Sequence, residues 1–206
     1  GPEGEARALR GRGEILTELG VLPEANRCFH DALDIYRDLG LRAEEARVLN
    51  LIGRVNYEQG YLPEAMAAFG ESLTIAPAPS VVDAVTAQDV LDVRAGAADG
   101  MARVHLKRRR MRRAVDTFRL ALGYRLGREA PNPQTQDLRN RGIAEAMRQI
   151  GFAHLHWNAE PVAEECFIRA RAIDLASSNG AAASDSLRGI CAVELSRTET
   201  DSAERT

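Results

Sequence analysis

Apolar and small residues recur along this chain at the three- and four-residue spacing of amphipathic helices, and that pattern itself repeats. One series of such positions starts at Gly13 and ends at Ala32. It begins again at Gly53, Ala102 and Gly151, at intervals of 40, 49 and 49 residues. Each series carries a phenylalanine preceded four residues earlier by an alanine: Ala25 and Phe29, Ala65 and Phe69, Ala114 and Phe118, Ala163 and Phe167. Because the chain has only five phenylalanines, this self-similarity predicts four structural repeats.

The residues between these positions predict that each repeat is a pair of helices joined by a tight turn. Gly20 and Gly60 permit the left-handed backbone that ends a helix. Pro23 and Pro63 follow promptly, at first-turn positions that need no N–H donor. The small residue that opens each series allows the two helices to cross closely, and the phenylalanine fills the space between neighbouring repeats.

This arrangement resembles the tetratricopeptide repeat family over roughly residues 5–177. The family period is about 34 residues, and the longer intervals here are similar to those of kinesin light chains and of actinobacterial signalling regulators. The resemblance implies an all-α, right-handed α-solenoid of four helix pairs, whose first helices line a concave groove that binds protein. The later repeats depart from the pattern, because Arg109 and Asn158 replace the turn glycine and His105 and His154 replace an aromatic residue.

The segments that interrupt the helical pattern predict how the chain is organised. Residues 1–5 are expected to lie outside the repeats, and Gly1-Pro2 resembles a protease-cleavage scar. Residues 6–197 are expected to form one solenoid, with unusually long first helices over 81–107 and 134–157. A capping helix with Leu187, Ile190, Cys191 and Leu195 toward the stack is expected before a disordered tail over 198–206. The predicted elements are repeats at about 6–42, 43–78, 80–128 and 134–178, and the capping helix at 182–196.

Composition excludes several classes of function. The net charge of −3 offers no overall attraction to nucleic acid or anionic membrane, and no apolar run is long enough to span a bilayer. Cys28, Cys166 and Cys191 share no metal-ligand spacing and are expected to be buried thiols of a cytoplasmic protein. No phosphate-binding glycine loop, GxSxG or HExxH motif is present, so neither an enzyme nor a cofactor is expected. His105 and His154 occupy equivalent positions about one helix diameter apart, roughly 10 Å, which is too far to share a metal ion.

Positive charge is concentrated between the helices of the third repeat. This run is either a patch for an acidic partner or nucleic acid, or a solvated turn, and the lack of interleaved aromatic residues favours the solvated turn. The run comprises Lys107, Arg108, Arg109, Arg110, Arg112 and Arg113.

Counting by the helical period from each small residue predicts which side chains face the groove. Among them, arginines of all four repeats would form a basic stripe suited to acidic or C-terminal peptide segments, or would merely keep an exposed face soluble. Asn50 and Arg54 resemble half of the carboxylate clamp of chaperone-binding family members, while Glu14 and Asp99 depart from it. The predicted groove residues are Arg10, Glu14, Asn50, Arg54, Tyr57, Asp99, Arg103, Arg148 and Phe152.

The sequence therefore predicts a protein-interaction module that binds a peptide or helix of a partner and serves a larger bacterial regulator or assembly. The alternative is a sensor of a small ligand or signal peptide that changes the pitch of its superhelix. A self-associating scaffold is a third alternative, and an enzyme is the least favoured.

Overall fold

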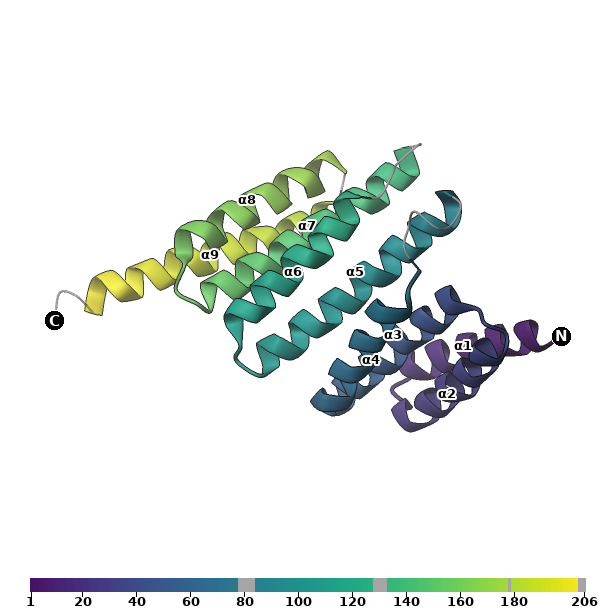
Figure 1. Ribbon diagram of the computed structural model, residues 1–206. Helices are drawn as coiled ribbons and strands as arrows, with labels where there is room; N and C mark the ends of the chain where they lie inside the picture. The colour runs from purple at the N-terminus through teal and green to yellow at the C-terminus, as the bar shows by residue number, and fades with distance from the viewer. Residues whose placement is uncertain (78–83, 128–132, 178, 204–206) are drawn as a thin grey trace. The chain divides into compact units, whose positions relative to one another are not determined.

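The computed structural model describes residues 1–77, 84–127, 133–177 and 179–203, and these ranges contain helices and turns without a strand. The all-α prediction is thus confirmed. Residues 78–83 and 128–132, where the sequence predicts the boundaries between repeats, lie outside the described residues. The helices (Figure 1) are α1 (Pro2–Glu18), α2 (Leu22–Asp38), α3 (Arg42–Gln59), α4 (Leu62–Ile75), α5 (Ala84–Lys107), α6 (Met111–Leu126), α7 (Pro133–Leu155), α8 (Glu160–Ala176) and α9 (Gly180–Ala203).

The chain divides into two compact units, Gly1–Val104 and His105–Thr206, with the division near the end of α5. In the first unit α1 packs on α2, α2 on α3 and α3 on α4. In the second unit α6 packs on α7, α7 on α8 and α8 on α9. Neighbours in the chain are therefore neighbours in space within each unit, as in a repeat fold. That residues 6–197 form one continuous solenoid stays a prediction.

The repeated phenylalanines lie where helices approach most closely. A Cβ atom placed on Gly53 would lie 2.7 Å from the ring of Phe69, and one placed on Gly100 would lie 2.3 Å from the same ring. Phe69 is thus held between α3 of its own repeat and α5 of the next. The ring of Phe167 has the same relation to Gly151 on α7, at 2.9 Å, and to the equivalent glycine of α9. Phe69 and Phe167 therefore fill the space between neighbouring repeats as expected, because each ring occupies room that a Cβ on either facing helix would take.

Five helix-ending turns use one left-handed residue each. Gly20, Gly40 and Gly60 have φ values of 76°, 68° and 85°, and Arg109 and Asn158 both have φ of 54°. In every case two backbone N–H groups bond back to the last turn of the helix, for example Arg109 N to Leu106 O at 2.9 Å. The residues that replace glycine in the sequence pattern therefore adopt the glycine conformation.

The last helix differs from its prediction. It runs from Gly180 to Ala203, so it continues into the segment where the sequence predicts a disordered tail. Leu187 and Leu195, expected toward the stack, are 41% and 64% exposed, and Cys191 is exposed as well. The reason is the close approach of Phe167 to Gly189, which turns a different face of α9 inward. The buried face comprises Ala183, Ser186, Gly189 and Val193, with Ile190 packed beside it.

None of the described helices is long and apolar enough to cross a membrane. Of the three cysteines, only Cys28 is buried as expected, while Cys166 is half-buried.

Candidate functional site

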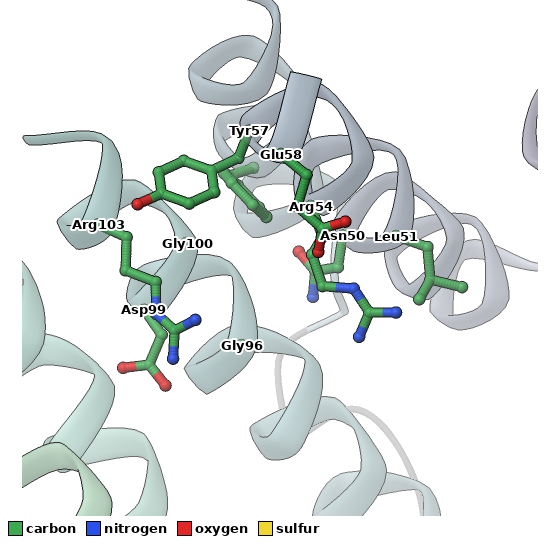
Figure 2. A pocket seen from close by; sticks show the side chains of 10 residues that line it. Asn50, Leu51, Arg54, Tyr57, Glu58, Gly96, Asp99, Gly100 and Arg103 are labelled. Atoms are coloured by element: carbon green, nitrogen blue, oxygen red, sulfur yellow. The ribbon is translucent and has the colours of Figure 1, made fainter. Parts of the chain in front are cut away.

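A pocket of about 360 Å³ opens between α3 and α5 in the unit Gly1–Val104 (Figure 2). Residues that are one turn apart on each helix line it, so successive turns present their side chains to the same space. The floor is apolar and includes Phe69, the ring that lies between the two helices. The lining residues are Asn50, Leu51, Arg54, Tyr57, Glu58, Phe69, Gly96, Asp99, Gly100 and Arg103.

Asn50 joins the two walls of the pocket. Its Nδ2 donates a hydrogen bond of 2.7 Å to the backbone carbonyl of Val93 on α5. The carbonyl acceptor fixes the orientation of the amide, because only the NH₂ side can donate. The Oδ1 atom is buried and meets no hydrogen-bond donor among the described residues. The pocket therefore borders an unsatisfied acceptor, which an N–H donor of a ligand reaches only by displacing the atoms that cover it.

Arg54 and Arg103 supply positive charge from α3 and α5 respectively. Both side chains are exposed, and neither forms an ion pair with any residue that the structure describes. Glu58 and Asp99 bring negative charge to the same pocket, and Tyr57 brings an aromatic ring with a hydroxyl group. This combination can bind a carboxylate through a guanidinium fork, an N–H group through a carboxylate or amide oxygen, and an apolar side chain on the floor.

Five of the predicted groove residues meet in this pocket: Asn50, Arg54, Tyr57, Asp99 and Arg103. The residues that the helical period selects on α3 and on α5 therefore line one pocket in the structure.

The structure places two predicted residues of α1 elsewhere. The Nη1 atom of Arg10 lies 2.7 Å from a carboxylate oxygen of Glu44 on α3, and its side chain is only 19% exposed. Glu14 lies 3.9 Å from the same guanidinium and does not line the pocket. Arg10 therefore ties α1 to α3.

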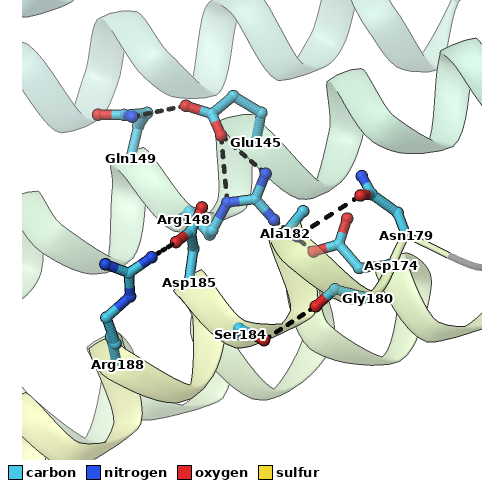
Figure 3. A network of polar contacts seen from close by, with 10 residues as sticks. All are labelled: Glu145, Arg148, Gln149, Asp174, Asn179, Gly180, Ala182, Ser184, Asp185 and Arg188. Atoms are coloured by element: carbon cyan, nitrogen blue, oxygen red, sulfur yellow. Dashed lines mark hydrogen bonds and ion pairs between the residues drawn. The ribbon is translucent and has the colours of Figure 1, made fainter.

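Arg148 is buried in an ionic network instead of facing a groove (Figure 3). Its guanidinium donates to Asp174, a carboxylate with no exposed surface on α8, and to Glu145 one turn away at 2.8 Å. Burial raises the pKa of Asp174 above its ordinary value, and the nearby charge of Arg148 counteracts this only in part. The prediction that Arg148 belongs to a basic stripe along the groove is therefore wrong, because its guanidinium is buried and pairs with Asp174.

Phe152 is also engaged in packing. Its ring meets that of Phe167 edge to face, with centroids 4.8 Å apart and planes at 67°. The ring belongs to the core cluster around Ala163, Phe167 and Val193. Two predicted groove positions of α7 thus serve the interior of the second unit.

The pocket also contains residues that counting by the helical period does not find, namely Leu51, Glu58, Phe69, Gly96 and Gly100. The two glycines carry a sequence signal, since they are one turn apart in a helix that otherwise lacks glycine. Glycine in a helix interior costs up to about 1 kcal/mol relative to alanine, so such a pair indicates close approach or an opening.

The histidines at equivalent positions are partly or fully enclosed. His154 is 6% exposed, neither of its ring nitrogens has a hydrogen-bond partner in the described part of the chain, and its ring stacks on that of Trp157. Burial lowers the pKa of His154, and the charge of Arg119 lowers it further. Burial likewise lowers the pKa of His105, with added effects of Arg113, Arg110 and Arg108. The described residues contain no group of His, Cys, Asp and Glu side chains that could hold a metal ion.

Comparison with known proteins identifies the repeats. The family model described as tetratricopeptide repeat matches residues 4–78, which confirms the resemblance inferred from the sequence. The sequence has no significant match among curated proteins.

Solved structures extend the likeness to the whole chain. The crystal structure of BtubC from P. vanneervenii is 16% identical, with a TM-score of 0.67 over 86% of this chain and 66% of that one. Apo RapI is 15% identical, with a TM-score of 0.72 over 97% of this chain and 50% of RapI. A kinesin light chain of Podospora anserina with TPR-like repeats is 13% identical, with a TM-score of 0.70 over 100% of this chain and 92% of that one. This chain therefore has the all-α repeat fold of tetratricopeptide-like proteins, and it spans about two thirds of BtubC and half of RapI.

Proposed function

We propose that this tetratricopeptide-like chain is a protein-interaction module, and that the pocket between α3 and α5 binds an extended segment of a partner protein. The observation that carries the proposal is the pair of arginines, Arg54 and Arg103, beside the apolar floor at Phe69. Neither arginine is neutralised by a described residue. Arg10 in the same unit, in contrast, pairs with Glu44.

The polar groups of the pocket suit the end of a peptide. A terminal carboxylate can accept two parallel hydrogen bonds from one guanidinium. The Oδ1 atom of Asn50 can accept a backbone N–H of the same segment once the atoms that cover it move aside, which satisfies a buried atom that no described donor pairs with. The apolar floor then accommodates a side chain, and such anchors supply most of the energy of peptide binding. We assign the module to a cytoplasmic regulator or assembly of a bacterium.

The test is binding to an array of peptides with free C-termini, in parallel with the same peptides amidated at the C-terminus. The amidated peptides should bind more weakly, because they lack the carboxylate. Changing Arg54 and Arg103 together to Gln should lower the affinity for free peptides about tenfold or more, since hydrogen bonds to charged groups contribute about 1.5–3 kcal/mol.

A matched control exists in the same unit. Arg12 and Arg42 are exposed and make no ion pair with a described residue, so changing both to Gln removes the same charge away from the pocket. This control should bind free peptides like the unaltered chain. Equal losses in the two double variants, or equal binding of free and amidated peptides, would contradict the proposal.

A second candidate is a sensor of a signal peptide. It is favoured by the match to a Rap protein complexed with Competence and Sporulation Factor, which is 16% identical with a TM-score of 0.69 over 98% of this chain. A sensor changes conformation when its peptide binds, whereas a simple docking module need not. Small-angle scattering of the chain with and without a peptide selected from the array separates the two. An unchanged scattering profile at saturation would remove the sensor as a candidate.

A further inference from the structure

The turn between α5 and α6, in the unit His105–Thr206, carries five arginines that no described carboxylate neutralises. Its five arginines form no ion pair with any residue in the described part of the chain. Elsewhere in this unit arginines do pair, for example Arg141 with Asp137 at 2.6 Å and Arg197 with Glu164 at 2.6 Å. We call the six basic residues Lys107, Arg108, Arg109, Arg110, Arg112 and Arg113 the basic turn.

Local stability does not account for Arg109, Arg112 and Arg113. Arg109 has a φ of 54°, where the equivalent turns of the first two repeats use glycine. Arg112 and Arg113 stand in the first turn of α6, which contains no acidic residue. The positive end of the helix dipole disfavours cations there. At the equivalent position of the first two repeats the helix begins with proline and glutamate.

The charges of the basic turn also act on the interior. His105 ends the buried part of α5, and its pKa is lowered by burial and then by Arg113, Arg110 and Arg108. The guanidinium groups of Arg113, Arg110 and Arg108 thus lie close enough to the imidazole to repel its protonated form. An anionic partner would relieve this repulsion, whereas water and salt only screen it.

We propose that the basic turn is a second interaction surface, which binds a short acidic segment of a protein partner. Clustered carboxylates suit it because each guanidinium can hold one bidentately. Nucleic acid suits it less well, because residues 107–113 contain no aromatic side chain for base stacking and the whole chain has a net charge of −3. The surface of a single turn is also smaller than the roughly 600–1,000 Å² of protein surface that one nucleic-acid-binding module buries. The basic turn shares no residue with the pocket between α3 and α5, so this proposal stands independently of that site.

The test uses the full chain and a fluorescently labelled octaglutamate, followed by anisotropy at low and at physiological ionic strength. We expect binding that weakens as salt increases and that shifts the imidazole resonances of His105. The double variant R112Q/R113Q should bind at least about twofold more weakly, because each exposed ion pair contributes roughly 0.2–1 kcal/mol.

The matched control is R169Q/R171Q, which removes two exposed charges from α8 in the same unit. It should retain the affinity of the unaltered chain. An equal loss in this control would overturn the proposal, because the attraction would then be a general effect of net charge. Tighter binding of an oligothymidylate of equal charge would assign the surface to nucleic acid instead, and absence of octaglutamate binding at low ionic strength would also overturn the proposal.

Discussion

Changing Gly100 to Ala should destabilise the first unit, although alanine is the better helix former. Gly100 lies in the interior of α5, where its replacement by alanine alone would contribute about 0.8–1.0 kcal/mol of stability. The added Cβ atom would lie 2.3 Å from Cζ of Phe69, more than 1 Å inside ordinary contact. The ring cannot retreat, because a Cβ on Gly53 would already lie 2.7 Å from it on the other side.

The magnitude follows from these two effects. Forcing an extra methyl group into a packed core typically costs 1–3 kcal/mol, and the double-sided contact of Phe69 puts this site at the upper end, about 2–3 kcal/mol. After the gain in helix propensity is subtracted, the variant should lose about 1–2 kcal/mol of its free energy of unfolding. For a chain of this size the corresponding decrease in melting temperature is about 2–8 °C.

Urea denaturation followed by circular dichroism measures the loss, with Gly70→Ala as the control. Gly70 lies in α4 of the same unit and a Cβ placed there meets no atom within 4 Å, so this variant should gain close to 1 kcal/mol. Changing Phe69 to Leu in the Gly100→Ala background should remove part of the clash, which a double-mutant cycle would detect. If Gly100→Ala proved as stabilising as Gly70→Ala, the interpretation that the ring of Phe69 is held tightly between α3 and α5 would be refuted.

Three further predictions concern the second unit. Replacing Arg109 by Gly should raise the melting temperature by removing about 1 kcal/mol of left-handed strain, and Asn158→Gly should do so less because asparagine tolerates that conformation better. The lowered pKa of His154 means that the unfolded chain binds more protons, so the free energy of unfolding should fall as the pH drops from about 6.5 toward the folded-state pKa. H154Q should flatten this decline in pH-dependent urea titrations, and an unaltered decline would rule out His154 as its source. Asp174→Asn should cost about 3 kcal/mol, because Arg148 then loses its buried partner, and changing the pair to Leu and Met should recover most of that loss in thermal melts.

Much of the fold could be predicted because each repeat position has one dominant physical requirement. The phenylalanine between helices needs small residues opposite it, so Gly53 and Gly151 could be identified from spacing alone. The partner glycine on the next repeat could not, because its offset depends on intervals that vary from repeat to repeat. Gly100 and Gly189 were therefore missed, and with Gly189 the buried face of α9.

Residues of the pocket could be predicted from spacing only where no neighbouring side chain pairs with them inside the fold. Asn50, Arg54 and Arg103 line the pocket as expected, because no described acidic residue pairs with either arginine. Arg148 occupies the position equivalent to Asn50, but Asp174 lies on the buried face of α8 and requires a cation. An aspartate in register with Phe167 and Ala170 is the signal that could have predicted this pair.

One structural feature connects packing and binding in the first unit. Gly100 receives the ring of Phe69, and Gly96 and Gly100 are the two positions of the α5 wall that carry no side chain. A Cβ on Gly96 would lie 3.5 Å from Nδ2 of Asn50, and one on Gly100 would run into the ring of Phe69, so a larger residue at either position would crowd a residue that lines the pocket. The close contact of the helices and the opening between them therefore depend on the same absence of Cβ atoms. Because Phe69 also forms the pocket floor, a ligand that contacts the floor contacts the residue that joins α3 to α5. The proposed ligand would therefore contact the junction between two successive repeats.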